Sequence, residues 1–136
     1  MKYIILAMLL LVGCSTNVAN KDEDKYKKKA VIVKLNEANF EAKTKTGVVV
    51  VDFYADWCGP CRMLSPVLEE LTEVTVGKVD IETEQNLAVE YNVSSIPLLV
   101  FMKDGKEESR MVGLQTKEKI QKVIDGLKED KEDKED

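Results

Sequence analysis

One seven-residue segment, Val48–Tyr54, carries apolar or aromatic side chains at every position except Asp52. An unbroken apolar run of this length is typical of a strand covered on both faces, because a strand with one solvated face alternates apolar and polar residues. Such strands occur mainly in sheets that have helices on both sides. The segment therefore predicts an α/β domain built around a central sheet.

The rest of the chain adds strands and helices in alternation. We predict strands at 31–33, 48–54, 74–80, 98–102 and 107–112, and helices at 36–43, 60–73 and 116–127, with a short one from Thr83. Asn36 and Thr116 open two of these helices as capping residues. Asp104-Gly105 joins the last two strands as a hairpin. We expect a mixed five-stranded sheet flanked by helices.

The first fourteen residues resemble an export signal. Lys2 precedes a short apolar run at 3–12, and Gly13 precedes Cys14. About ten helical residues span about 15 Å, half of a hydrocarbon core, so a spanning helix is not expected. Residues 11–14, Leu-Val-Gly-Cys, resemble the lipobox of bacterial lipoproteins, which implies cleavage before Cys14 and its acylation. An ordinary signal peptide that contains a cysteine is the alternative.

Composition divides the chain into four parts. The length of 136 residues, with 44% hydrophobic and 33% charged residues, fits one domain with tails. We predict a lipoprotein signal peptide at 1–13, a lipid-anchored Cys14 with a charged linker at 14–29, a folded domain at 30–127 and a charged, disordered tail at 128–136. This organisation predicts a membrane-anchored protein of the cell envelope that faces outside the cytoplasm.

Cys58 and Cys61 follow the buried strand directly and open the next predicted helix. A thiolate at a helix N-terminus faces unpaired backbone N–H groups, which lower the pKa of the thiol. Pro60 suits the first helical turn, where its missing N–H costs nothing. We expect an exposed Cys58 to attack disulfides and Cys61 to resolve the mixed disulfide.

Other chemistries are less compatible with this composition. A structural zinc site needs four ligands, whereas this chain has three cysteines and no histidine. A purely structural disulfide over so small a loop would restrict the unfolded chain little. The net charge of −5 argues against a nucleic-acid partner. We expect no metal and no cofactor other than the Cys58–Cys61 disulfide.

Residues 51–63, Val-Asp-Phe-Tyr-Ala-Asp-Trp-Cys-Gly-Pro-Cys-Arg-Met, resemble the active-site segment of the thioredoxin family. The similarity extends from about Val31 to Leu127. Further matches in the family's order are Pro66, Lys78-Val79-Asp80, Ser95-Ile96-Pro97, Asp104-Gly105 and Val112-Gly113. The resemblance implies the thioredoxin fold and a protein-disulfide reductase.

The resemblance also implies roles for two charged residues. Asp52 lies in an otherwise apolar strand, so burial should raise its pKa, unless it faces solvent at the strand end. In thioredoxins the aspartate at this place assists deprotonation of the second cysteine, here Cys61, through water. Lys78 matches the lysine that neighbours this aspartate. Without the resemblance, Lys78 would be interpreted as an ordinary surface charge.

Ile96-Pro97 matches the family's cis-proline site beside the sulfurs. Sequence alone favours a trans bond, and the resemblance reverses that expectation. A cis bond would leave the Ile96 backbone free to pair with an extended substrate strand. The substrate-binding patch implied is Trp57, Gly59, Pro60, Ile96, Pro97 and Gly113. Plain packing for Trp57, a trans proline and a turn at Gly113 are the alternatives.

The chain departs from the family pattern in two places. The stretch from Pro66 to Lys78 is shorter than usual, so the helix after Cys61 or the loop behind it must be trimmed. Tyr54 stands where many thioredoxins carry a second tryptophan. Neither change touches the cysteine pair.

Three functions remain open from the sequence. A reductase of envelope protein disulfides is favoured by Gly59 and Pro60 between the cysteines and by Ile96 before Pro97. A disulfide oxidase or isomerase is the second, because exported domains lie where disulfides form. A binding module with incidental cysteines is the third. An exported reductase would need a membrane thiol electron donor as a partner besides its disulfide-containing protein substrates.

Overall fold

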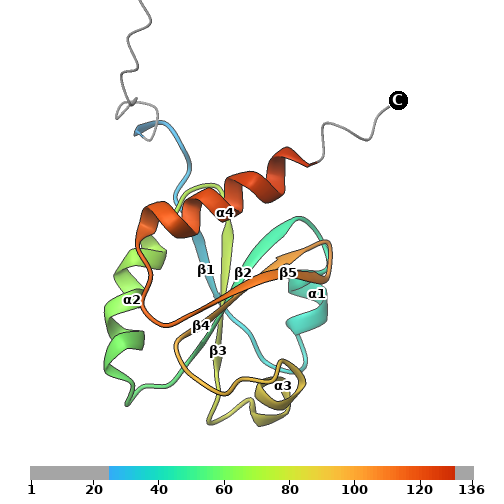
Figure 1. The fold of residues 1–136 in the computed structure, drawn as a ribbon. Helices are drawn as coiled ribbons and strands as arrows, with labels where there is room; N and C mark the ends of the chain where they lie inside the picture. The colour runs from blue at the N-terminus through green and yellow to red at the C-terminus, as the bar shows by residue number, and fades with distance from the viewer. Residues whose placement is uncertain (1–24, 131–136) are drawn as a thin grey trace, which may run out of the picture.

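In residues 25–130, which the computed structural model describes, five strands form one sheet with helices on both faces (Figure 1). The strands are β1 Val31–Lys34, β2 Val48–Tyr54, β3 Thr75–Asp80, β4 Leu98–Lys103 and β5 Lys106–Val112. The helices are α1 Phe40–Thr44, α2 Gly59–Glu69, α3 Gln85–Glu90 and α4 Lys117–Glu129. The predicted α/β fold with a mixed five-stranded sheet is confirmed.

The strand order is β1-β3-β2-β4-β5, which places β2 at the centre of the sheet. Strands β1, β3 and β2 run parallel, whereas β4 is antiparallel to β2 and β5 is antiparallel to β4. Within this register Asp52 of β2 lies beside Lys78 of β3 on one side and Leu99 of β4 on the other. Parallel strands end at one edge, so residues that follow β2 and β3 meet there.

Strand β2 is buried on both faces, as its composition predicts. Val49, Val51 and Phe53 face a core cluster that includes side chains from α1 and α3. Val50 faces the opposite cluster, which includes Leu64 of α2 and side chains of α4. Each such buried side chain contributes about 1.5–3 kcal/mol. Because side chains alternate along a strand, Asp52 shares the face of Val50 and points to the layer of α2 and α4.

Helix α2 is shorter than the sequence indicated, ending at Glu69 rather than near Glu73. Glu73 adopts a positive φ of 54°, which a continuing helix cannot accommodate. Its backbone N–H donates to the carbonyl of Lys28 at 2.7 Å, and β3 begins at Thr75. The shortening relative to the family between Pro66 and Lys78 stays a prediction. In the structure this stretch contains the end of α2 and a tight connection to β3, at the opposite end of α2 from Cys58.

Two other boundaries differ from the predictions. Helix α1 begins at Phe40, because Asn36 and Asn39 accept hydrogen bonds from each other's backbone N–H and form a turn ahead of it. Helix α4 begins after the predicted cap, Thr116, whose hydroxyl accepts from the Lys119 N–H. It continues to Glu129, so Lys128 and Glu129, which we assigned to the tail, belong to the helix.

The predictions for the chain ends fall mainly outside the described residues. The signal peptide at 1–13, Cys14, most of the linker and the tail from 131 onward are among them. Lys28 and Lys29 already contact the domain, Lys29 through a β-bridge with Thr72, so the predicted linker ends before Lys28. Within residues 25–130 no helix has the length and apolar character needed to cross a membrane.

Candidate active site

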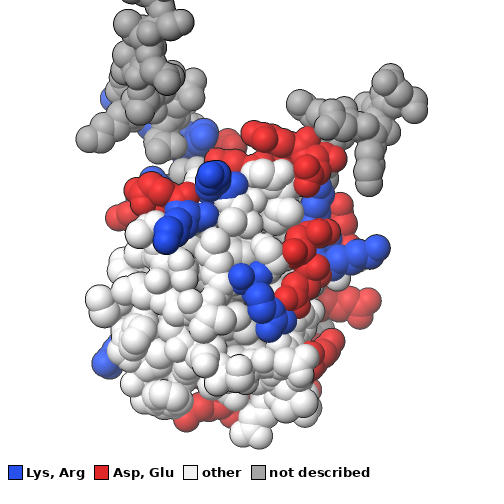
Figure 2. Space-filling view, viewed as in Figure 1, with Lys and Arg blue, Asp and Glu red and all other residues white. Residues whose placement is uncertain are grey.

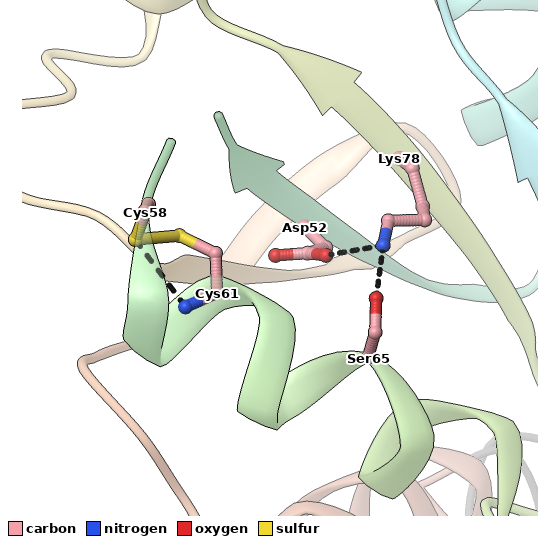
Figure 3. Close-up of a disulfide and its surroundings, with 5 residues drawn as sticks. All are labelled: Asp52, Cys58, Cys61, Ser65 and Lys78. Carbon is pink, nitrogen blue, oxygen red and sulfur yellow. Dashed lines mark hydrogen bonds and ion pairs between the residues drawn. A yellow bond between two sulfur atoms is a disulfide. The ribbon is translucent and has the colours of Figure 1, made fainter. Parts of the chain in front are cut away.

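Cys58 and Cys61 form a disulfide at the N-terminus of α2 (Figure 3). Cys58 is the N-cap residue, and its Sγ accepts a hydrogen bond from the backbone N–H of Cys61 at 3.3 Å. Pro60 lies in the first turn, where no N–H partner is required. The turn after β2 is closed by the Cys58 N–H, which donates to the carbonyl of Ala55 at 3.2 Å. The central strand thus presents the sulfur pair at the edge of the sheet.

The expected exposure of Cys58 is wrong for the disulfide form. Cys58 is 5% exposed and Cys61 is 3% exposed, so both are buried. Ala55, Ile81 and Ile96 pack around the pair and cover it. What distinguishes the two cysteines is their place on the helix. Cys58 caps its N-terminus, while Cys61 lies inside the first turn.

Asp52 and Lys78 meet beneath α2, as the resemblance implied. Asp52 is 1% exposed, and Lys78 Nζ lies 3.5 Å from its Oδ2. Within residues 25–130 neither carboxyl oxygen of Asp52 accepts a hydrogen bond. Burial raises the pKa of Asp52 to about 6, although the Lys78 charge draws it down part of the way. The solvent-facing alternative for Asp52 is therefore excluded.

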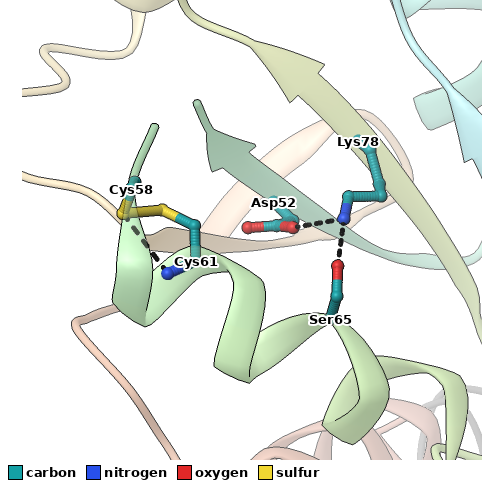
Figure 4. A network of polar contacts seen from close by, with 5 residues as sticks. All are labelled: Asp52, Cys58, Cys61, Ser65 and Lys78. Carbon is teal, nitrogen blue, oxygen red and sulfur yellow. Dashed lines mark hydrogen bonds and ion pairs between the residues drawn. A yellow bond between two sulfur atoms is a disulfide. The ribbon is translucent and has the colours of Figure 1, made fainter. Parts of the chain in front are cut away.

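Ser65, which the sequence analysis did not single out, and Tyr54, which it noted only as a departure from the family pattern, complete the surroundings of Lys78. Its ammonium group donates to Ser65 Oγ at 2.6 Å (Figure 4). The same group lies 4.6 Å from the centre of the Tyr54 ring. Ser65 follows Cys61 by four residues, so both lie on one face of α2. That spacing is the signal in the sequence that could have identified Ser65.

The Ile96–Pro97 bond is cis, as the resemblance implied and against the expectation from sequence alone. Pro97 is buried, and its carbonyl accepts from the Gly113 N–H at 2.8 Å. Gly113 has a φ of 84°, a conformation that glycine adopts without strain. Ile96 also packs against the sulfur pair. Ile96, Pro97 and Gly113 therefore lie together beside the disulfide.

The surface around the disulfide is apolar. Trp57 is 64% exposed, which excludes plain packing, and its indole N–H donates to Glu82 Oε1 at 3.0 Å. Pro60 is exposed and Gly59 half-buried. Val112 and Leu114, which the sequence analysis did not assign to this surface, are also exposed. Figure 2 shows charged side chains gathered over α4 and along one side, while the lower part of this face is largely free of them.

The zinc site considered from the sequence would need several ligand side chains close together. Residues 25–130 contain no group of three or more His, Cys, Asp or Glu side chains placed to hold a metal ion. The two cysteine sulfurs are instead bonded to each other. The redox pair is thus the chemically reactive feature that the structure places at this edge of the sheet.

The family model described as thioredoxin matches residues 31–126, which include the whole sheet and most of α4. The chain belongs to the thioredoxin family. The cysteine pair at the start of α2, the buried Asp52 and the cis-proline all lie within the matched region.

Individual relatives agree over the same region. Thioredoxin from Chlamydia trachomatis serovar D is 49% identical over 94 residues, covering 66% of this chain and 92% of the relative. Thioredoxin from Staphylococcus aureus is 43% identical over 99 residues, covering 69% of this chain and 95% of the relative. A solved mutant thioredoxin from Halobacterium salinarum superposes with a TM-score of 0.64 at 37% identity, covering 73% of this chain and 90% of that one.

The family and the site together define the activity. This family member is a thiol–disulfide oxidoreductase and a protein-disulfide reductase, which acts on disulfide-containing proteins through the Cys58–Cys61 pair. The reaction moves two electrons from a dithiol to a substrate disulfide by thiolate attack.

Proposed function

We propose that this protein is a lipid-anchored reductase that reduces protein disulfides in the cell envelope, outside the cytoplasm. The sequence pattern at Cys14 supports the anchor. The observation that carries the proposal is the placement of the disulfide at the end of the domain opposite to the point where the chain enters it. A tether on one end leaves the other end free to meet substrates.

The strand register gives the separation of these two ends. The chain enters at Lys29, beside Thr72, and β1 begins opposite Thr75 at the start of β3. The disulfide follows Tyr54, which pairs with Asp80 at the end of β3. A strand rises about 3.3 Å per residue, so the two ends lie about 17 Å apart along the sheet. Figure 1 shows the same arrangement, with the blue N-terminal segment and the start of α2 at opposite ends.

The cycle is proposed as follows. The Cys58 thiolate attacks a substrate disulfide, forms a mixed disulfide and releases one substrate thiolate. Cys61 then attacks Cys58 Sγ, which restores the Cys58–Cys61 disulfide and releases the second substrate thiolate. Before this attack the Cys61 thiol passes its proton to Asp52 through water. Asp52 is suited to that step because its pKa of about 6 leaves it ionised, yet basic, at neutral pH. Lys78 acts on Asp52 through its charge.

Substrate docking is assigned to the apolar surface beside the disulfide. We expect the Ile96 backbone to pair with an extended substrate segment, since no hydrogen bond among residues 25–130 uses its N–H or carbonyl. Pro97 and Gly113 hold that segment of backbone in place. Trp57, Gly59 and Pro60 supply apolar contact on the other side of the sulfurs.

The electron supply follows from the proposed location. A reductase outside the cytoplasm cannot draw on cytosolic NADPH directly. We therefore propose a membrane thiol carrier as the donor that returns two electrons to the Cys58–Cys61 disulfide. Its dithiol would approach from the same face that substrates use and would attack the Cys58–Cys61 disulfide.

The reduction potential of a chain beginning at residue 15 tests the direction of the reaction. Trp57 is the single tryptophan and adjoins Cys58, so its fluorescence should report the redox state during titration with dithiothreitol. We expect a potential near about −270 mV, as in reducing thioredoxins. A potential near about −120 mV would instead identify a disulfide donor, the oxidase or isomerase alternative.

Cysteine variants test the catalytic assignment. Cys58→Ser should abolish reduction of insulin disulfides, because no thiolate remains to attack. Cys61→Ser should accumulate mixed disulfides with substrates, because the resolving thiol is missing. Mass spectrometry of the trapped species distinguishes the two variants. Unchanged partner binding in both, with no trapped substrate, would instead support a binding module.

Acylation of Cys14 is tested by labelling cells with a fatty-acid analogue and separating membranes. The full-length protein should be labelled and sediment with membranes, whereas Cys14→Ser should be neither. Cys58→Ser is the matched control and should remain labelled, since it alters a different thiol. A Cys14→Ser protein that is still labelled would contradict the proposed anchor without affecting the reductase assignment.

A further inference from the structure

We propose that Ser65 is a positioning residue for the disulfide chemistry: its hydroxyl binds the Lys78 ammonium and holds it away from Asp52, so that Asp52 remains able to accept and return the Cys61 proton. The inference rests on the proton-transfer role proposed above for Asp52 and is independent of the proposed envelope location. It concerns a residue outside the motif that carries the family resemblance.

The distances support this tether. Lys78 Nζ lies 2.6 Å from Ser65 Oγ but 3.5 Å from Asp52 Oδ2. A charge-assisted N–H···O hydrogen bond to a carboxylate is normally about 2.7–2.9 Å long. The ammonium group is therefore hydrogen-bonded to the neutral hydroxyl. It lies farther from the buried carboxylate, where the electrostatic attraction is weaker. A lysine without a second partner would be expected to close that gap.

The position of Ser65 allows it to act as the tether. Helix α2 covers the face of the sheet on which Asp52 and Lys78 lie. Ser65, one turn after Cys61, points from α2 toward the Lys78 ammonium (Figure 3). The Tyr54 ring, 4.6 Å from the ammonium, bounds it from the same strand as Asp52. Ser65 and Tyr54 together leave Lys78 a defined place beside the carboxyl group.

The charged and titratable groups around Asp52 come from three elements. Helix α2 contributes the cysteine pair, strand β3 contributes Lys78, and β2 itself contributes Tyr54. Strand β4 places the apolar Leu99 beside Asp52. Lys78 is the cation that lowers the pKa of Asp52 against the effect of burial. Its distance from the carboxylate is therefore the variable through which Ser65 can act.

Ser65→Ala tests the proposal in the oxidised protein, where the disulfide does not titrate and Asp52 can be followed alone. The probe is the carboxyl ¹³C chemical shift of Asp52 against pH. Loss of the hydroxyl should let Lys78 approach Asp52, which should lower the titration midpoint by about one pH unit, a tenfold change in acidity. Alanine is a strong helix former, so α2 should remain folded.

Two controls separate this role from a structural one. Ser65→Thr keeps the hydroxyl and should keep the midpoint near its original value. In a Lys78→Met background there is no ammonium to hold, so adding Ser65→Ala should produce no further shift. A pure effect on packing would shift the midpoint equally with and without Lys78.

The activity provides a second measurement. The acidic limb of the pH–rate profile for insulin reduction by the reduced protein should move to lower pH in Ser65→Ala, in the direction of the NMR midpoint. A midpoint that stays unchanged or rises in Ser65→Ala would overturn the proposal, because the hydroxyl would then not be holding Lys78 off. Either result leaves the assignment of Cys58 and Cys61 unaffected.

Discussion

The buried carboxyl group of Asp52 lowers the free energy of unfolding when it is ionised. Its carboxyl group is buried with a pKa of about 6, compared with 3.8 for the ordinary side chain. Between these values the native state binds more protons than the unfolded state, so the free energy of unfolding falls as pH rises from about 4 to about 6. Above that range the full penalty of an ionised, buried group is present. The proton-transfer role that we propose for Asp52 would account for a carboxyl group, rather than an apolar side chain, at this position.

Asp52→Asn should therefore stabilise the oxidised protein at pH 8, by about 2–3 kcal/mol, since the amide carries no charge to bury. The gain should shrink as pH falls below about 6 and disappear below about 4. Urea unfolding across this pH range measures it. Asp56→Asn, which changes an exposed carboxyl group, is the control and should show no such trend. An equal gain at every pH would contradict the argument from ionisation.

Among the elements, β3 contains a position, Gly77, at which only glycine fits without a clash. Gly77 pairs with Val51 of β2 and Val33 of β1. A Cβ added there would lie 2.2 Å from Cδ1 of Leu35, a residue with no exposed surface. Leu35 has little room to move because protein interiors are close-packed. Gly77 thus lets Leu35 fill the core beneath the sheet.

Gly77→Ala should destabilise the protein by about 1–3 kcal/mol, the usual cost of overpacking a core. Gly126→Ala is the matched control, because a Cβ there meets nothing within 4 Å and the residue lies in α4. It should stabilise the protein by about 0.5–1 kcal/mol through helix propensity. Thermal and urea unfolding measure both. Similar effects of the two substitutions would show that Leu35 moves aside.

Helix α4 is stabilised at its N-terminus by its capping residue, Thr116. Thr116→Ala removes the hydroxyl that accepts from the Lys119 N–H and should cost about 1 kcal/mol of unfolding free energy. Thr116→Ser keeps an acceptor and should remain within a few tenths of a kcal/mol of the original protein. Chemical denaturation compares them. A loss of equal size in both variants would assign the effect to the threonine methyl group instead.

At the scale of the whole molecule, one sheet joins two cores. Strands β2 and β4 send Val49, Val51 and Val100 to the α1–α3 side and Val50 and Leu99 to the α2–α4 side. Neither core can lose its packing without exposing the strands that the other one covers. We infer that the described domain unfolds as one unit.

Coincident unfolding curves test this inference. Trp57 fluorescence reports the active-site edge, and far-ultraviolet circular dichroism reports the whole fold. Both should give the same urea midpoint and slope in the oxidised protein. A fluorescence transition at lower urea would show that the edge carrying the disulfide opens before the sheet does.

The sequence by itself determined the class of fold and the location of the chemistry. The apolar run of β2 indicated a strand buried on both faces, and the residues around Cys58 and Cys61 indicated the redox pair, because these signals are local and dense. The resemblance added Asp52, Lys78 and the cis bond before Pro97. Element ends were less predictable: a positive φ at Glu73 and a turn at Asn36 set them, and neither has a strong local pattern.

Only the tertiary structure decided which side chains meet across elements. It buried both cysteines beneath Ile96 and its neighbours, and it left Trp57 exposed. It also placed Ser65 of α2 on Lys78 of β3, thirteen residues away in the chain, and left Lys78 at 3.5 Å from Asp52. Sequence patterns report burial and local geometry, whereas the distance between two charges depends on how a helix lies on a sheet. Burial raises the pKa of Asp52, and the charge of Lys78 at this distance lowers it part of the way back. Both effects arise only when the elements are packed together.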